Sequence, residues 1–189
     1  LDHLDLRDLH VAGHSMGGFL TLMLADRAPE RLASVSLLTS APTNGPRNFL
    51  LFDQALRMRR TPDLPEGFWL RNLFPWFMSP AFFSEPANLD ASIAASYAYP
   101  FAQTTDSMQL QLDALTGFDA APYVKPLPCR AQAILGANDL LFNEADAKEA
   151  LAPIPDLTIS TIEDAAHSIH WEQPHKVAEA LRSFALNAP

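Results

Sequence analysis

A serine near the start of the chain lies between two glycines, in the run Gly13-His14-Ser15-Met16-Gly17-Gly18. Residues 10–14 before it form a short apolar stretch typical of a strand, and residues 17–28 after it repeat apolar side chains at helical spacing. A serine at a strand–turn–helix junction with the pattern G-x-S-x-G occupies a nucleophile elbow, which holds its hydroxyl out toward a substrate carbonyl. The pattern therefore predicts Ser15 as a nucleophile.

The residues around this serine have roles of their own in such a turn. We expect Gly13 and Gly17 to be glycines because a side chain at either position would clash with the neighbouring strand or helix. Met16 lies at the start of the predicted helix, where the helix dipole favours negative charge. We expect its backbone N–H to donate to the oxyanion that forms when the serine attacks a carbonyl.

A serine hydroxyl becomes a good nucleophile when a base removes its proton and an acid orients that base. Residues 129–136 are typical of a strand and are followed by Asp139; residues 157–163 are typical of another and are followed by His167. Chemistry in parallel sheets gathers at the carboxyl ends of strands. We therefore predict a catalytic triad of Ser15, Asp139 and His167, with His167 as the base and Asp139 holding its ring.

Other residues compete for these roles. Asp164 lies too near His167 along one loop to face the far ring nitrogen easily, and Asp146 falls inside a predicted helix. His170 is the rival base, but its place beside Trp171 indicates local packing. A metal site on His167 and His170 lacks accompanying ligands. The remaining candidates are interpreted as structural or solvent-facing: His3, His10, His14, His175 and the small hydrophobe Cys129.

The elements that must position these residues alternate along the chain. Further strand and helix patterns cover residues 33–39, 106–115, 143–151 and 174–186. Strands separated by helices predict an α/β fold, with a mostly parallel sheet covered by helices on both faces.

Residues 43–103 differ from the rest of the chain. They hold 12 of the 18 aromatic residues, five acidic and five basic side chains and several prolines, which favours short helices. We therefore divide the chain into core residues 1–42, a helical cap insert at 43–103, and core residues 104–189. A cap without net charge predicts a small or medium apolar substrate, and Trp76 and Phe77 are our first candidates for lining its site.

Composition excludes several classes of function. The 189 residues carry a net charge of −9, which disfavours nucleic-acid and anionic-membrane partners. No apolar run approaches the length of a membrane span. The single cysteine forms no internal disulfide. We expect no metal and no organic cofactor, a small-molecule ester or lactone as partner, and by default a cytoplasmic location; the oligomeric state stays open.

Three motifs together resemble the α/β-hydrolase superfamily. They are the elbow, the loop Gly136-Ala137-Asn138-Asp139, and His167 followed by Trp171-Glu172-Gln173-Pro174, which is similar to that family's H-x4-E-x-P ending. Within the family, the stretch 75–83 and Tyr99-Pro100 look like the branch of 3-oxoadipate enol-lactonases and related small esterases. The resemblance covers almost the whole chain and implies a serine hydrolase that needs no cofactor.

The family pattern also implies segments upstream of Leu1. About four strands usually precede the elbow strand, which corresponds to roughly 80 or more residues. That part normally includes a loop, often beginning His-Gly, that supplies the second oxyanion amide. We therefore expect residues 1–189 alone to fold poorly, with the sheet edge beside residues 10–14 unpaired.

These features predict hydrolysis of a small or medium apolar carboxylic ester or lactone through an acyl-enzyme. The same triad also serves carbon–carbon bond hydrolases, cofactor-free perhydrolases and acyltransferases. A small-molecule receptor of the same fold is the alternative from another class, and tight binding without turnover would identify it.

Overall fold

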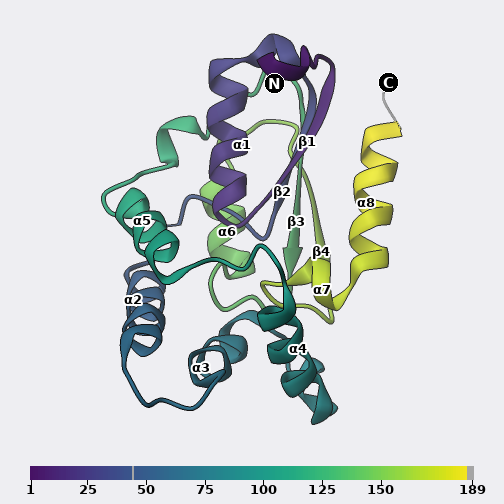
Figure 1. Cartoon of the computed structure of the whole chain (residues 1–189). Helices are drawn as coiled ribbons and strands as arrows, with labels where there is room; N and C mark the ends of the chain where they lie inside the picture. Colours follow the sequence, from purple (N-terminus) through teal and green to yellow (C-terminus); the bar gives the residue numbers. More distant parts are fainter. Residues whose placement is uncertain (44, 187–189) are drawn as a thin grey trace.

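The computed structural model describes residues 1–43 and 45–186 (Figure 1). Short 3-10 turns connect its main elements, which are in chain order β1 (Leu9–His14), α1 (Met16–Arg27), β2 (Leu32–Leu38), α2 (Pro46–Arg60), α3 (Phe68–Phe77), α4 (Ala87–Ala98), α5 (Thr105–Leu115), β3 (Arg130–Gly136), α6 (Glu144–Leu151), β4 (Thr158–Ile162), α7 (Ile169–Glu172) and α8 (Pro174–Leu186).

The four strands form one parallel sheet in the order β1-β2-β3-β4. The register pairs His14 with Leu38, Leu38 with Ile134, and Gly136 with Ile162. The strands therefore end close to one line across the sheet, and the loops that follow them gather at that edge. This confirms the predicted parallel sheet.

Side chains alternate between two apolar layers on the faces of the sheet. Ala133 and Leu135 of β3 pack into a cluster with Leu22 of α1 and Leu151 of α6. Ile134 between them faces the opposite cluster, which includes Val177 of α8. Both faces of the sheet are thus covered by helices, as predicted (Figure 1).

The helices α2, α3 and α4 all fall within the aromatic segment 43–103 and lie beyond the carboxyl ends of the strands (Figure 1). Apolar residues join them to α5, where Met108 packs with Ala55 and Leu56 of α2. The helical layer over the site therefore continues past residue 103. The division of the chain at residues 42 and 103 remains a prediction.

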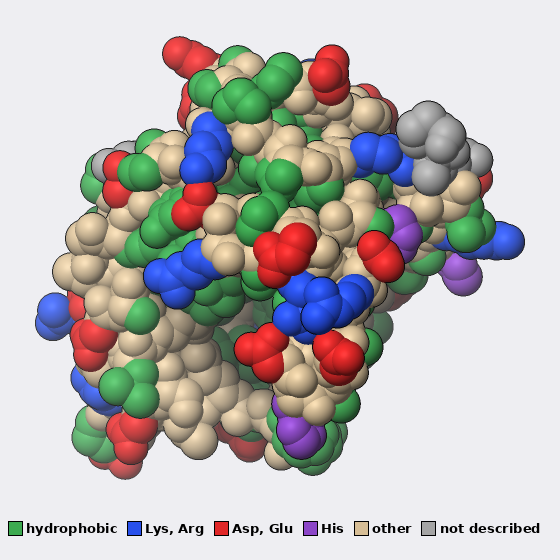
Figure 2. Space-filling view, turned by 90° about the horizontal axis from the view of Figure 1, so that it is seen from above, with side chains coloured by type: hydrophobic (Ala, Val, Ile, Leu, Met, Phe, Trp, Pro, Cys, Tyr) green, Lys and Arg blue, Asp and Glu red, His purple; other side chains and the backbone are tan. Residues whose placement is uncertain are grey.

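Charges of both signs lie next to one another at the end of the molecule away from these helices (Figure 2). Lys125 pairs with Asp26, and Arg31 pairs with Asp2 at 2.7 Å. The Arg31 guanidinium holds the pKa of the Asp2 carboxyl below its usual range. Among the helices of residues 1–43 and 45–186, none has the length and apolar character needed to cross a membrane.

Candidate active site

Ser15 lies at the sharp turn between β1 and α1. Its backbone has φ 54° and ψ −121°, a conformation that costs roughly 1–3 kcal/mol in a residue other than glycine. Two contacts hold the turn: the Ser15 N–H donates to the Leu38 carbonyl at 3.0 Å, and the Ser40 hydroxyl donates to the Ser15 carbonyl at 2.7 Å. The neighbouring strand β2 and the residues after it therefore fix the strained serine in place.

The glycines of the turn differ in how much space surrounds them. A Cβ at Gly13 would lie 2.1 Å from the Gly17 carbonyl oxygen, so the prediction for Gly13 agrees with the structure. The prediction for Gly17 is wrong, because a Cβ there would meet nothing within 4 Å apart from its own helix. Gly18 has the constrained position instead, since its Cβ would lie 2.2 Å from the Ser40 hydroxyl oxygen.

We expect opposite effects from alanine at the two adjacent helical glycines. Gly18→Ala should lower the free energy of unfolding by about 1–3 kcal/mol, because its methyl group would overlap Ser40. Gly17→Ala should raise it by about 0.5–1 kcal/mol, because alanine loses less backbone entropy in a helix. Chemical denaturation of the protein produced from its complete coding sequence measures both, and equal effects would contradict this packing.

Asp139 and His167 come from the loops after β3 and β4 and form a buried pair. His167 Nδ1 lies 3.0 Å from Asp139 Oδ2, and the two residues are 2% and 4% exposed. The other carboxylate oxygen of Asp139 accepts from the backbone N–H groups of Leu141 and Phe142 at 2.7 and 3.0 Å. The carboxylate is thus oriented by its own loop, and it accepts from Nδ1 so that Nε2 remains for another partner.

The structure brings Ser15 and His167 to the wall of one cavity. Within the described part of the chain, the Ser15 hydroxyl makes no hydrogen bond, either to His167 or to another group. Met16 is the first residue of α1, so no carbonyl of the helix one turn earlier accepts from its N–H. The rival acid Asp146 instead lies in the first turn of α6, where its N–H donates to the Asn143 side chain.

Two cavities open beside Ser15 and Met16, one of about 100 Å³ and one of about 410 Å³. Phe77 lines the larger one, with its ring centroid 5.3 Å from that of His167. Trp76 lines neither cavity and packs under the Arg47 guanidinium, 5.4 Å from the ring centroid. Successive residues of a helix point about 100° apart, and in this structure Phe77 is the one of the two that lies toward the cavity.

Residues 1–180 match a protein-family model described as "Alpha/beta hydrolase family". The chain belongs to the alpha/beta hydrolase family. Over its whole length this hydrolase chain is 25% identical to a protein of Pseudomonas syringae pv. syringae (strain B728a) described as "Putative carbamate hydrolase RutD" and covers 72% of it. A shorter match, 58% identical over 41 residues, covers 11% of the dihydrolipoyllysine-residue acetyltransferase component of the acetoin cleaving system of Pseudomonas putida.

Solved structures share the fold of this alpha/beta hydrolase. Rv0554 from Mycobacterium tuberculosis superposes with a TM-score of 0.84 at 23% identity, covering 100% of this chain and 69% of that one. The enol-lactonase from Burkholderia xenovorans LB400 gives a TM-score of 0.79 at 22% identity, covering 97% of this chain and 67% of that one. These likenesses confirm the fold, and the chain spans 67–72% of the length of these two proteins and the Pseudomonas syringae relative.

Two side chains of the hydrolase core hold the loop that carries His167. The His167 carbonyl accepts from the Thr39 hydroxyl at 2.9 Å and from His14 Nε2 at 2.8 Å. Thr39 is fully buried and has φ 39°, an outlier for a β-branched residue. Because a carbonyl only accepts, His14 must carry its proton on Nε2. No sequence pattern indicates this contact, because only the fold brings His14 and His167 together.

Glu172 connects the same loop to the helices of segment 43–103. One of its carboxylate oxygens accepts from the Ala166 N–H and the other from the Ser79 N–H, each at 2.8 Å. The Ser168 N–H donates to the Phe77 carbonyl at 2.9 Å. The chain at the end of α3 is therefore fastened on both sides of His167.

His14 and His170 also line the larger cavity, with their ring centroids 4.5 Å apart. Burial, and then the neighbouring His167, lowers the pKa of His14 from its ordinary 6.5 to about 4. The same two causes lower the pKa of His170. Both rings are therefore neutral at pH 7. His170, interpreted from the sequence as local packing, instead faces the cavity.

The depressed pKa of His14 predicts loss of stability in acid. Between pH 6.5 and about 4 the unfolded chain binds a proton on His14 that the folded chain does not bind. The free energy of unfolding should therefore fall through this range, by up to about 3 kcal/mol from this residue. His14→Gln, whose amide keeps a donor for the His167 carbonyl, should flatten the fall and leave the smaller share of His170. Urea titrations from pH 4 to 7 test this, and an unchanged slope in the variant would contradict it.

Proposed function

We propose that the chain carries the reacting groups of a serine hydrolase that cleaves small or medium neutral carboxylic esters or lactones. The observation that carries the proposal is the arrangement at one cavity: Ser15 on a strained elbow and His167 both line it, and the buried Asp139 carboxylate lies 3.0 Å from His167 Nδ1. A strained serine and a carboxylate-oriented imidazole are the parts that acyl transfer requires.

The reaction divides into two steps. In the first, His167 Nε2 removes the Ser15 proton, Ser15 Oγ bonds to the substrate carbonyl carbon, and the ester C–O bond breaks as His167 gives the proton to the leaving oxygen. In the second, His167 removes a proton from water, whose oxygen bonds to the acyl carbon, and Ser15 is released with its proton restored. Asp139 stabilises the imidazolium that forms in each step.

The developing oxyanion needs donors that do not move during the reaction. The Met16 N–H is free at the start of α1, where the helix dipole adds positive potential. Among residues 1–43 and 45–186, this N–H is the group that we assign as the donor to the oxyanion. The narrow turn at Ser15 sets the direction of this N–H, because serine and donor are consecutive residues.

The lining of the cavities supports a neutral substrate. Aromatic and aliphatic side chains dominate the larger cavity, and none of its described lining residues is Asp, Glu, Lys or Arg. The proteins similar to this chain include one described as an enol-lactonase and one described as a putative carbamate hydrolase. Ester, lactone and carbamate share an electrophilic carbonyl, so all three belong in the test of this proposal.

Covalent capture tests the proposal directly. An alkyl fluorophosphonate should attach to Ser15 and not to another serine, and peptide mass mapping identifies the site. The same preparation should hydrolyse at least one of p-nitrophenyl acetate, a five- or six-membered lactone and an aryl carbamate. Prior phosphonylation should abolish that turnover. A protein labelled at another residue, or unlabelled and inactive on all three, would overturn the proposal.

A further inference from the structure

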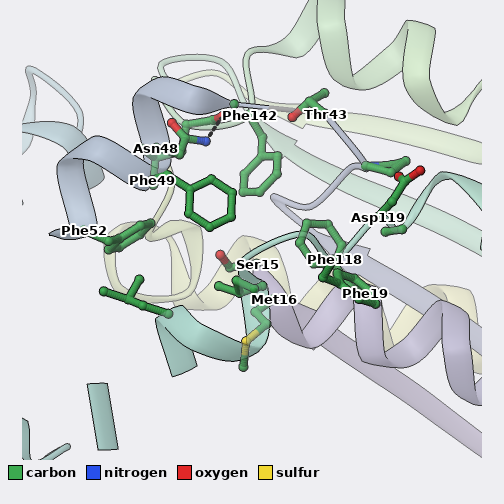
Figure 3. Close-up of a pocket in the computed structure, with 16 residues that line it drawn as sticks. Ser15, Met16, Phe19, Thr43, Asn48, Phe49, Phe52, Phe118, Asp119 and Phe142 are labelled. Carbon is green, nitrogen blue, oxygen red and sulfur yellow. Dashed lines mark hydrogen bonds between the residues drawn. The ribbon is translucent and has the colours of Figure 1, made fainter. Parts of the chain in front are cut away.

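The two cavities diverge on either side of Ser15. Both include Ser15 and Met16, and both touch Phe52 of α2 and Leu112 of α5. The small cavity of about 100 Å³ continues beneath α2, where aromatic rings surround the serine (Figure 3). The large cavity of about 410 Å³ continues between α3 and α7. A substrate that reacts at Ser15 therefore has two unequal spaces for its two halves.

Phe142 separates the histidine from the small cavity. Its side chain lines the small cavity, and its ring stacks against His167 with 5.6 Å between centroids and 23° between planes. His167 itself lines the large cavity and is absent from the described lining of the small one. The imidazole therefore meets the substrate from the large-cavity side.

The side on which His167 lies decides which half of the substrate enters which cavity. The carbon attacked by Ser15 carries an oxyanion, a leaving oxygen and an acyl chain. The oxyanion faces the Met16 N–H, and the leaving oxygen must lie within hydrogen-bond reach of His167 to receive its proton. The leaving group therefore extends into the large cavity, and the acyl chain takes the remaining direction, into the small one.

Resting on the proposed function, we propose that the small cavity binds the acyl chain and the large cavity binds the leaving alcohol. The preferred substrates are then acyclic esters of short neutral acids with bulkier neutral alcohols. A lactone fits this division poorly, because its ring joins the acyl carbon to the leaving oxygen and cannot extend into both spaces at once.

The dimensions and charges of the small cavity limit the acyl chain. Its 100 Å³ holds roughly three or four groups of the size of water, which corresponds to chains of up to about four carbons beyond the carbonyl. Asp119 lies on its lining, which includes no described Lys or Arg. An acyl chain that ends in a carboxylate would meet like charge without a partner cation, so we expect such half-esters to be rejected.

Two exposed aromatic residues allow each cavity to be enlarged by itself. Phe49 lines the small cavity and is 38% exposed, and Trp171 lines the large cavity and is 53% exposed. Neither belongs to the candidate triad, and their exposure makes truncation to alanine compatible with folding. The variants Phe49→Ala and Trp171→Ala are thus matched controls for one another.

The experiment measures kcat/KM for two substrate series with the protein produced from its complete coding sequence. The acyl series is p-nitrophenyl acetate to decanoate with a hemisuccinate, and the alcohol series is methyl, benzyl and naphthylmethyl acetate with a six-membered lactone. The parent should prefer short acyl chains and large alcohols. Phe49→Ala should raise the rate on the octanoate about tenfold or more and leave the alcohol series unchanged. Trp171→Ala should alter the alcohol series alone.

Each other outcome has a defined meaning. The assignment is overturned if Phe49→Ala changes the alcohol series while Trp171→Ala changes the acyl series, if either variant shifts both series equally, or if the lactone or the hemisuccinate is the best substrate. Loss of fluorophosphonate labelling at Ser15 together with no turnover on any ester would instead overturn the proposed function. The two failures are therefore distinguishable.

Discussion

Ser15→Ala is expected to lower kcat/KM for a short-chain aryl ester by about 10⁴-fold to 10⁶-fold. In the proposed mechanism the hydroxyl oxygen bonds to the substrate, so its removal leaves the oxyanion donor and the cavities without a nucleophile. The fold should persist, because the contacts that fix the turn use the backbone N–H and carbonyl of Ser15. Steady-state kinetics with p-nitrophenyl butyrate measures the loss.

Three further variants distinguish loss of chemistry from loss of structure. Ser96 also lines the large cavity, so Ser96→Ala should retain the rate to within a few-fold. Ser15→Gly should lose activity as fully as Ser15→Ala yet gain stability, because glycine adopts φ 54° without strain. His167→Ala combined with Ser15→Ala should cost no more than either alone, since the two act as a unit. A parental rate in Ser15→Ala would contradict the assigned nucleophile.

Asp139→Asn is expected to lower kcat by about 10³-fold to 10⁴-fold with little change in folding. The amide oxygen can still accept from the Leu141 and Phe142 N–H groups, which leaves the amide NH2 facing His167 Nδ1. That donor forces the ring to carry its proton on Nε2. The ring then has no lone pair with which to accept the Ser15 proton.

The rival acid provides the matched control for this variant. Asp164 precedes His167 in the same loop but does not share the Nδ1 hydrogen bond, so Asp164→Asn should keep most of the activity. The two substitutions make the same chemical change at nearby positions. Equal losses, or a larger loss for Asp164→Asn, would show that the carboxylate has been assigned to the wrong residue.

The sequence predicted the elements that depend on local pattern. Outside segment 43–103, the apolar periodicity located every strand and every helix except the short α7 to within a residue or two. The carboxyl-end rule placed Asp139 and His167 in adjacent loops, where the structure joins them at 3.0 Å. The roles of Ser15, Asp139 and His167 stay predictions until the kinetics are measured. These residues come near one another only if their strands are neighbours in the sheet, and that order follows from the helical connections between successive strands.

The sequence-based predictions were wrong where the result depends on the direction in which a side chain points from its helix. Trp76 and Phe77 are equally aromatic, and only the orientation of α3 determines that Phe77 faces the site while Trp76 packs with Arg47. For the same reason, Gly17 was predicted to be crowded, whereas the structure places the close contact at Gly18. The partner of His14 was not predicted because it is a backbone carbonyl from a distant loop, and a sequence shows nothing of such acceptors.

The carboxylate of Glu172 couples the position of α3 to the position of the loop that carries the imidazole. One of its oxygens accepts from the chain just beyond α3 and the other from the loop that carries the imidazole. If α3 moved outward to admit a large alcohol, the same movement would break one of the two contacts that fix the loop carrying the imidazole. The loop that carries His167 would then be held less firmly while the entrance is open, and closure over the bound ester would restore the contact that orients it.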